Sequence, residues 1–338
     1  MKHLLLTLLF FCSLYAKDYT QKREVQAFID DLIIHDHFQF LYLQKLFQNV
    51  QKQNVPLRFF SKKKHKPTPA AIKRYPVHGA WDRYVRLKVT PKRIKDGADF
   101  VRKYRDVFQK AEKTYGVPKE YIAAIIGVES LYGKNMGKFP VFDTLVTLAF
   151  EPNRRNKFFK SELREFLQLC HENGINPKNV KGSFAGAIGL GQFMPSNYEA
   201  YGVDFNKDGR VSLLHPHDAI ASIANYLKKN GWRRGEPVAT RVSYCGTRFT
   251  QCKTGYNRTY FRSRLKNIFP KNGKWNYHDK VRLIKLDRKA YDELWYGAKN
   301  FYVITRYNHS AYYAMSIHQL AEGIKQYRKY GKIYLSKK

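Results

Sequence analysis

The chain has 338 residues, 43% of them hydrophobic, which is enough to bury a large core and to form two or three subdomains. Its 62 Lys and Arg against 27 Asp and Glu, a net charge of +35, predict a polyanionic partner: nucleic acid, an anionic lipid surface or an acidic polymer such as a cell-wall glycan. The positive charge is spread along the chain and no nucleic-acid-binding motif is present, so we expect no nucleic-acid partner.

The N-terminus has the pattern of an export signal. Lys2 is followed by an apolar run from Leu4 to Tyr15, too short to span a bilayer, and then by the small residue Ala16. We therefore expect residues 1–16 to be a signal peptide that is cleaved on export. Cys12 offers a lipid-anchored alternative, which the two phenylalanines before it disfavour.

Residues 21–53 are predicted to form two helices in a hairpin, because their apolar residues recur at helical spacing. The region from 54 to 80 contains four prolines and many basic residues, which is typical of a linker or an extended surface segment. After Trp81 to Tyr84 we expect a short strand that ends before Pro91, and then a helix from Arg102 to Tyr115.

The apolar stretch that ends at Glu129 is a candidate for chemistry. Pro118 suits the first turn of a helix, and Ile122, Ile125 and Ile126 precede Glu129 at helical spacing. The carboxylate therefore shares a face with three isoleucines, and burial there would raise its pKa. A carboxylic acid still protonated near neutral pH can donate a proton to a leaving group. The alternative is an ordinary Glu in a last helical turn, solvated or paired with a Lys or Arg.

A glycine-rich loop from Gly182 to Ser196 follows a predicted helical region at residues 140–172. Its glycine spacing is neither that of a dinucleotide-binding fingerprint nor that of a P-loop, and no strand is predicted before it. We expect the glycines to let the backbone pass close to a ligand or to a neighbouring helix.

The segment from Asp204 to Gly209 has the start of an EF-hand calcium loop, with side-chain oxygens at positions 1, 3 and 5 and Gly at position 6. His215 stands where the usual bidentate acid would be, but Asp218 follows three residues later. Oxygen ligands at this spacing repel each other unless a cation is present, so we expect a structural Ca²⁺. The alternative is an Asx-rich turn with no ion.

Residues 232–300 differ in character, with strand patterns at Val238–Val242 and Val281–Leu286, and predict a small β-containing region. Cys245 and Cys252 flank a turn-like segment and would form a disulfide in an oxidising compartment, whereas Cys170 is expected to be a buried free thiol. Helical spacing returns from Ser310 to Tyr330.

Several stretches, in this order, together resemble the lytic murein transglycosylases of the membrane-bound B type (glycoside hydrolase family 103), relatives of the goose-lysozyme fold. Each motif alone is modest, but their joint occurrence over about Trp81 to Tyr313 is specific. The matching stretches are Tyr115–Pro118, Ile125–Ser130 with Gly133, Gly182–Ala187, Gly191–Ser196, Asp204–Gly209 and Tyr307–Ser310.

The resemblance implies a mainly α (α+β) fold: a lysozyme-like helical core with a small β domain and an outer helical domain. The corresponding divisions would be 17–80 for the N-terminal part of the outer domain and the linker, 81–231 for the core with the calcium loop, 232–300 for the β domain, and 301–338 for the return to the core.

The resemblance also implies an enzyme that cleaves the β-1,4 bond between N-acetylmuramic acid and N-acetylglucosamine in peptidoglycan without water and leaves a 1,6-anhydromuramyl end. Glu129 matches the family's sole catalytic acid, which would donate a proton and then recover one. Ordinary glycosidases use two carboxylates, and no second one stands out in the matching motifs. The site residues carried over for substrate binding are Ser183, Gln192, Asn308, Tyr84, Tyr307 and Tyr313, and those for calcium are Asp204, Asn206, Asp208, Arg210 and Asp218.

The expected location is the periplasm, and the expected partners are peptidoglycan glycan strands and cell-wall synthesis proteins, with the chain itself a monomer and no cofactor used in catalysis. Two alternatives stay open: a hydrolytic, lysozyme-like muramidase and a non-catalytic wall-binding module.

Overall fold

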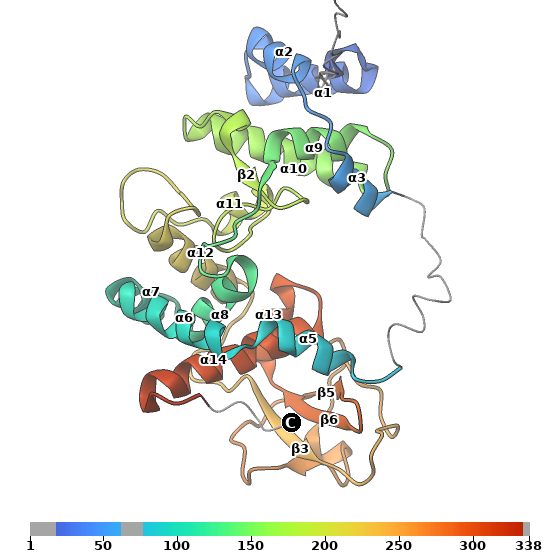
Figure 1. The fold of residues 1–338 in the computed structure, drawn as a ribbon, viewed down its shortest axis with the longest axis vertical. Helices are drawn as coiled ribbons and strands as arrows, with labels where there is room; N and C mark the ends of the chain where they lie inside the picture. Colours follow the sequence, from blue (N-terminus) through green and yellow to red (C-terminus); the bar gives the residue numbers. More distant parts are fainter. Residues whose placement is uncertain (1–17, 62–76, 334–338) are drawn as a thin grey trace, which may run out of the picture. The chain divides into compact units, whose positions relative to one another are not determined.

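The computed structural model describes residues 18–61 and 77–333, which divide into two units (Figure 1). The first contains 18–61 with 138–186, and the second contains 77–137 with 187–333. The predicted signal peptide, Cys12 and most of the predicted linker lie outside the described residues. This division differs from the expected one, because residues 138–186 group with the N-terminal helices and not with the core.

The first unit contains the expected helical hairpin, α1 (Arg23–Asp36) and α2 (Phe40–Gln48). His37 ends α1 with a left-handed backbone (φ 59°), which turns the chain into α2. The ring of Phe28 packs edge-on against Phe47 and against Phe150 of a later helix, so the hairpin shares a core with the chain's middle. That middle consists of α9 (Val141–Phe150) and α10 (Asn156–Glu172), which lie side by side in Figure 1.

The short elements of the first unit are one helix in the region expected to be a linker, two 3₁₀ turns and a minimal antiparallel pair of strands that brackets α9 and α10. Their bounds are α3 (Asn54–Phe60), η1 (Tyr19–Gln21), η2 (Pro177–Asn179), β1 (Phe139–Pro140) and β2 (Lys181–Gly182). The expectation of an extended segment from residue 54 was therefore wrong over α3, because Pro56 sits in the first turn, where a helix tolerates it.

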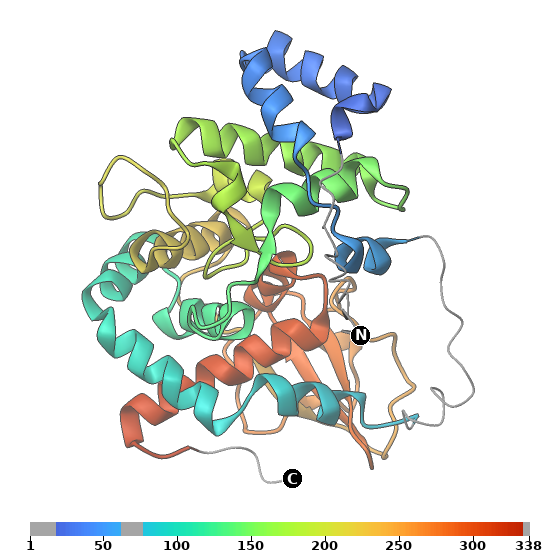
Figure 2. The ribbon, with the colours of Figure 1, turned by 45° about the horizontal axis from the view of Figure 1, so that its top comes forward.

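The second unit holds the helices that surround Glu129. Among them, the C-terminal helix α14 (Ala311–Tyr330) packs against α8 (Lys119–Ser130), which carries Glu129, and against α6 (Pro91–Lys103) (Figure 2). The helices are α5 (Ala80–Lys88), α6 (Pro91–Lys103), α7 (Arg105–Tyr115), α8 (Lys119–Ser130), α11 (Pro195–Tyr201), α12 (Pro216–Lys229), α13 (Lys299–Tyr307) and α14 (Ala311–Tyr330).

One sequence expectation in this unit was wrong, and another was right except at its start. The short strand expected before Pro91 is the helix α5, which buries Trp81 completely and presents charged residues on its other side. The helix expected from Arg102 to Tyr115 is confirmed by α7 from Arg105 onward, while Arg102 and Lys103 end α6, because Tyr104 has a ψ of 35° that departs from helical geometry. The ring of Tyr104 packs against Phe100, which fixes the break.

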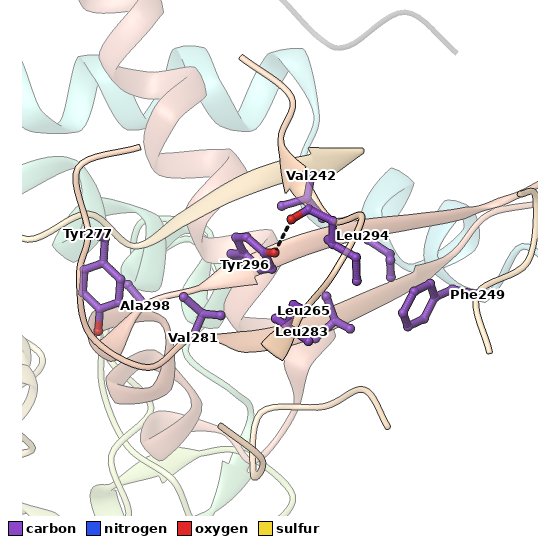
Figure 3. Close-up of a cluster of buried hydrophobic side chains, with 10 residues drawn as sticks. Val242, Phe249, Leu265, Tyr277, Val281, Leu283, Leu294, Tyr296 and Ala298 are labelled. Atoms are coloured by element: carbon purple, nitrogen blue, oxygen red, sulfur yellow. Dashed lines mark hydrogen bonds between the residues drawn. The ribbon is translucent and has the colours of Figure 1, made fainter. Parts of the chain in front are cut away.

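The β region is a four-stranded antiparallel sheet in the order β4-β3-β6-β5. The strands are β3 (Ala239–Ser243), β4 (Phe269–Pro270), β5 (Arg282–Asp287) and β6 (Asp292–Gly297). Two of them confirm the strands predicted near residues 238–242 and 281–286. One face of the sheet covers its own apolar cluster, which includes Leu265, Leu283 and Tyr296 (Figure 3).

The predicted disulfide is not formed, since Cys245 and Cys252 both carry free thiols. Cys252 packs against the apolar cluster of the β region, whereas Cys245 is exposed. The loop between them is held by Asp292, which accepts hydrogen bonds from the backbone of Phe249 (2.9 Å) and from Arg248 (3.1 Å). The buried thiol of Cys170 is free, as expected.

The mainly helical α+β architecture with a small β domain is confirmed. Among the described residues, no helix combines the length and the apolar character that crossing a membrane would require.

Candidate active site

Glu129 lies in the last turn of α8, as its spacing from the three isoleucines predicts. Ile122, Ile125 and Ile126 are completely buried, whereas Glu129 is partly exposed at the end of the same face. The helix then stops, because Leu131 adopts a left-handed backbone conformation (φ 53°). A buried helix that ends in this way holds a carboxyl group at the boundary between core and solvent.

Tyr313, near the start of α14, makes the direct contact with this carboxyl group. Its hydroxyl donates a hydrogen bond of 2.6 Å to Oε1 of Glu129. The ring of Tyr307, at the end of α13, is stacked on Tyr313, with 6.3 Å between centroids and 9° between planes. The Tyr307 hydroxyl in turn donates to the carbonyl oxygen of Gly191 at 2.5 Å. The structure therefore brings Tyr307 and Tyr313 together with Glu129 and the glycine-rich loop.

Burial raises the pKa of Glu129, because the charged form is poorly solvated there. The hydrogen bond from Tyr313 and the positive charge of Lys88 both favour the carboxylate and oppose this shift without cancelling it. Burial also raises the pKa of Tyr313 well above its usual value, so its hydroxyl stays a donor. A carboxylic acid in these surroundings can give up a proton and can then exist as an anion supported by one hydrogen bond and one cation.

Tyr84 approaches the site from α5. Its ring stacks on the buried Trp81 at 6.0 Å, and its hydroxyl is hydrogen-bonded to Ser316 of α14. Ser316 also donates to the carbonyl oxygen of Tyr313 at 2.8 Å. Tyr84 is therefore linked through Ser316 to the residue that holds Glu129.

Lys88 is a functional candidate that the sequence reasoning missed. It follows Tyr84 by one helical turn of α5, so the two side chains share a face. Burial lowers the pKa of Lys88, and the charge of Glu129 opposes that shift. The spacing from Tyr84 was the available signal, but one cation among 62 Lys and Arg does not stand out in the sequence.

Gln192 holds the glycine-rich loop in place. Its backbone is left-handed (φ 51°), and its Nε2 donates to the carbonyl oxygens of Met136 (3.0 Å) and Gly189 (2.9 Å). Met136 belongs to the segment that follows α8, so Gln192 ties this loop to the chain just beyond Glu129. A side chain on the neighbouring Gly191 would meet the Tyr307 hydroxyl at 2.8 Å, which explains glycine there.

Asn308 and Ser183 are placed differently. Asn308 is exposed at the end of α13, where its carbonyl oxygen accepts from the backbone of Ser310 at 2.6 Å. The Ser310 hydroxyl caps α14 by accepting from the backbone of Tyr313 at 3.2 Å. Ser183 belongs to the first unit, where its hydroxyl accepts from the backbone of Ala185 at 3.2 Å. The substrate-binding roles of both residues stay predictions.

Among the described residues, the groups that shift the pKa of Glu129 are Tyr313 and Lys88, and no second carboxylate is one of them. A cavity of about 500 Å³ lies beside the end of α8, between Tyr132, Met136 and Leu190, but Glu129 does not line it.

The predicted calcium loop forms a tight turn with left-handed backbones at Lys207 (φ 62°) and Gly209 (φ 87°). Asp204 accepts from the backbone of Asp208 (3.2 Å) and Gly209 (2.9 Å). The fully buried Asp218 accepts from the backbone of residues 205 and 212, both at 2.9 Å, so it closes the loop from the helix that follows.

The side-chain oxygens of this loop are chemically suited to a hard cation such as Ca²⁺. Asn206 and Asp208 are joined by a hydrogen bond of 2.7 Å from Nδ2 to Oδ2, and Asp208 Oδ1 accepts from the backbone of Arg210 at 3.0 Å. Within residues 18–61 and 77–333, no three His, Cys, Asp or Glu side chains converge as metal ligands. In this structure the carboxylates of Asp204 and Asp208 accept hydrogen bonds from backbone N–H groups of the loop. The metal-ligand set stays a prediction.

Comparison with known proteins supports one family. A family model described as "Transglycosylase SLT domain" matches residues 20–322, which is most of the chain. The chain belongs to the transglycosylase SLT family. The enzyme class expected from the sequence, a lytic transglycosylase, is thereby confirmed.

The similarity to individual family members extends over nearly the whole chain. Membrane-bound lytic murein transglycosylase B of Escherichia coli (strain K12) is 38% identical over 309 residues, which cover 91% of this chain and 84% of that protein. The structure of the E. coli lytic transglycosylase SLT35 in complex with bulgecin A is 37% identical and superposes with a TM-score of 0.84 over 93% of this chain and 96% of that one.

A second structure of SLT35 was solved in complex with calcium. It is 36% identical, with a TM-score of 0.84, and the match covers 93% of this transglycosylase and 96% of that chain. A calcium-bound relative of such similarity is consistent with the oxygen-rich loop described above.

Proposed function

We propose that this transglycosylase cleaves the β-1,4 bond between N-acetylmuramic acid and N-acetylglucosamine in peptidoglycan without consuming water. The observation that carries the proposal is the single carboxyl group of Glu129, which has a raised pKa, accepts a hydrogen bond from Tyr313 and has no second carboxylate among its interaction partners. In this proposal the same group acts first as the acid and then as the base.

In the first step, protonated Glu129 gives its proton to the glycosidic oxygen as the bond from that oxygen to C1 breaks. The carboxylate that results is stabilised by the Tyr313 hydroxyl and by the positive charge of Lys88. In the second step, the C6 hydroxyl of the muramic acid attacks C1, and its proton passes to Glu129. A new C1–O6 bond forms, a 1,6-anhydromuramyl end is released, and the carboxylic acid is restored.

The other residues hold the substrate and the site. The partly exposed rings of Tyr84 and Tyr307 would offer apolar surface to sugars, whereas the buried Tyr313 holds the carboxyl group of Glu129. Gln192 keeps the glycine-rich loop beside the end of α8. Ser183 and Asn308 would bind the sugar or its N-acetyl group, and Lys88 joins this set as an electrostatic partner of Glu129.

Ca²⁺ would have a structural role in this proposal. Asp204, Asn206, Asp208 and Asp218 would hold it through side-chain oxygens and Arg210 through its carbonyl group. The cation would neutralise the clustered carboxylates and stabilise the loop that precedes α12. We also propose export to the periplasm, where the substrate lies.

Replacing Glu129 with Gln tests the proposal. Glu129→Gln cannot donate the proton, so turnover of purified peptidoglycan should fall at least about 10²-fold, whereas binding in a sedimentation assay stays within about twofold. Near neutral pH the variant should melt at a temperature no lower than that of wild type. The pKa of Glu129 is higher in the folded protein than its usual value of 4.5, so keeping this group in the folded site costs stability at pH values above 4.5, and Gln removes that cost. Unchanged turnover would instead support a non-catalytic wall-binding module.

A further inference from the structure

The loops between β3 and β5 carry more positive charge than their acidic residues balance. Residues 250–280 contain eight Lys and Arg and a single acidic residue, Asp279. We call residues 261–271, within these loops, the basic–aromatic segment. The eight basic residues of the longer stretch, residues 250–280, are Lys253, Arg258, Arg262, Arg264, Lys266, Lys271, Lys274 and Lys280.

These cations are available to a partner. All eight are exposed, and in the described part of the chain none of them forms an ion pair with a carboxylate. The only acid among these loops, Asp279, is already paired with Arg233 at 2.7 Å. Arg262 bonds only to the backbone carbonyl oxygens of Trp275 and Tyr277, both at 3.1 Å, which leaves its charge uncompensated.

Two large aromatic rings are exposed among these cations. Phe261 is 52% exposed and Phe269 is 64% exposed, whereas Leu265 and Ile268 between them are buried at 2% and 3%. The ammonium group of Lys280 lies 4.7 Å from the centre of the Phe261 ring. The segment therefore has an inner side that belongs to the core and an outer side of phenylalanines and cations.

The basic–aromatic segment is held in a defined conformation. The 3₁₀ turn η3 (Arg262–Arg264) is closed by a bond of 3.0 Å from the backbone of Leu265 to Arg262, and Leu265 enters the apolar cluster of the sheet (Figure 3). The Tyr296 hydroxyl donates to the carbonyl oxygen of Ile268 at 2.7 Å, drawn as the dashed line in Figure 3. Phe269 begins β4, which pairs with β3.

We propose that the basic–aromatic segment docks the enzyme on an anionic membrane surface. Cations near such a surface are attracted to acidic headgroups, and apolar rings gain free energy by entering the boundary between headgroups and acyl chains. A soluble polyanion would explain the cations alone, because the rings of Phe261 and Phe269 would stay in water. The proposal does not depend on the chemistry at Glu129.

Vesicle sedimentation tests the proposal with the full chain, two test variants and two control variants. The vesicles are pure phosphatidylcholine or phosphatidylcholine with about 30% phosphatidylglycerol. Wild type should bind the acidic vesicles and release them as salt rises from about 0.1 to about 0.5 M, since the attraction is electrostatic. Arg264→Glu/Lys266→Glu and Phe261→Ser/Phe269→Ser should each weaken binding to acidic vesicles about tenfold or more.

Matched controls carry the same kinds of change elsewhere in the second unit. Lys95→Glu/Lys325→Glu reverses two exposed charges on α6 and α14, and Val77→Ser/Tyr330→Ser removes two exposed apolar side chains (88% and 55% exposed). Both controls should bind acidic vesicles within about twofold of wild type. All variants share residues 1–16, so differences between them report on the substituted positions.

Two results would overturn the proposal. Equal losses in the test and control variants would show that total charge, and not this segment, determines binding. Normal vesicle binding by the two test variants, together with reduced retention on purified peptidoglycan, would assign the segment to the wall polymer. Melting temperatures and turnover of soluble glycan fragments should be unchanged, because the four substituted side chains are exposed and none of them is among the groups that interact with Glu129.

Discussion

Glu129 acquires its chemistry from its position on α8. The buried isoleucine face raises its pKa, and the Tyr313 hydroxyl at 2.6 Å and the charge of Lys88 keep its anion attainable. A fully solvated Glu would ionise at its usual pKa and hold no proton for the glycosidic oxygen near neutral pH. The two opposing influences suit a group that donates a proton and then takes one back.

Replacing Tyr313 with Phe should move the pH dependence of the reaction. The first step needs protonated Glu129, so activity is present at low pH and is lost as pH rises through the pKa of this group. Tyr313→Phe removes a bond that lowers that pKa, and the alkaline limb of kcat/KM should shift to higher pH while the maximum rate falls about tenfold.

Tyr312→Phe is the matched control for this experiment. Tyr312 also belongs to α14, but its hydroxyl accepts a bond of 3.3 Å from the backbone of Asp287, and Glu129 is not a partner. Its pH profile should coincide with that of wild type. An unmoved alkaline limb in Tyr313→Phe would mean that Glu129 is not the group whose protonation limits the reaction.

At the scale of elements, α6 and α8 approach each other closely through two glycines and one tyrosine. A Cβ at either Gly97 or Gly127 would collide with the Tyr132 hydroxyl, which donates to the carbonyl oxygen of Arg93 at 2.8 Å. The ring of Tyr132 thus fills the space that the two glycines leave, immediately after the turn that carries Glu129.

Gly127→Ala should therefore destabilise the enzyme by about 1–3 kcal/mol, because the Tyr132 ring must move. Helix propensity alone would give the opposite sign, since Ala is favoured over Gly by about 1 kcal/mol in a helix. The free energy of unfolding from denaturant titration decides the sign. In a Tyr132→Ala background the same substitution should become neutral or stabilising, and an equal loss in both backgrounds would refute the packing account.

Many of the helices and strands could be predicted from the sequence. The periodic apolar residues indicate α1, α2, α8 and α14 because one face of each helix is buried, and β5 follows from its apolar run. The short helix α5 was mistaken for a strand because Val85, Leu87 and Val89 alternate with charged residues, as in a half-buried strand. The strand β6 was not predicted, since Asp292–Gly297 begins with two buried acids that local patterns place at the surface.

At the scale of the whole molecule, the grouping of residues 138–186 with the N-terminal helices was not predictable from periodicity. A helical pattern shows that a face is buried but does not name its partner, and here Phe28 and Phe150 meet from distant parts of the sequence. The approach of Tyr313 and Lys88 to Glu129 was similarly invisible in local spacing. Only the resemblance to a family indicated Tyr313, and the spacing of Lys88 from Tyr84 did not single it out among 62 Lys and Arg.

Calcium should stabilise the second unit through the loop around Asp208. Added Ca²⁺ should raise the melting temperature by several degrees, because an ion that binds only the folded state shifts the unfolding equilibrium, and a chelator should reverse the effect. Asp208→Asn should abolish the calcium-dependent increase, while Asp106→Asn, an exposed acid of α7, should retain it. Identical melting curves with Ca²⁺ and with chelator would reduce the loop to an Asx-rich turn.

The central claim is that Glu129 alone serves as acid and base while O6 of the sugar, and not water, attacks C1. Digestion of purified peptidoglycan in heavy-oxygen water tests this claim most directly. Mass spectrometry of the released muropeptides should show muramic acid ends that are lighter by one water and carry no heavy oxygen, because O6 of the sugar attacks C1. Reducible N-acetylmuramic acid ends that contain heavy oxygen would show hydrolysis and would contradict the account.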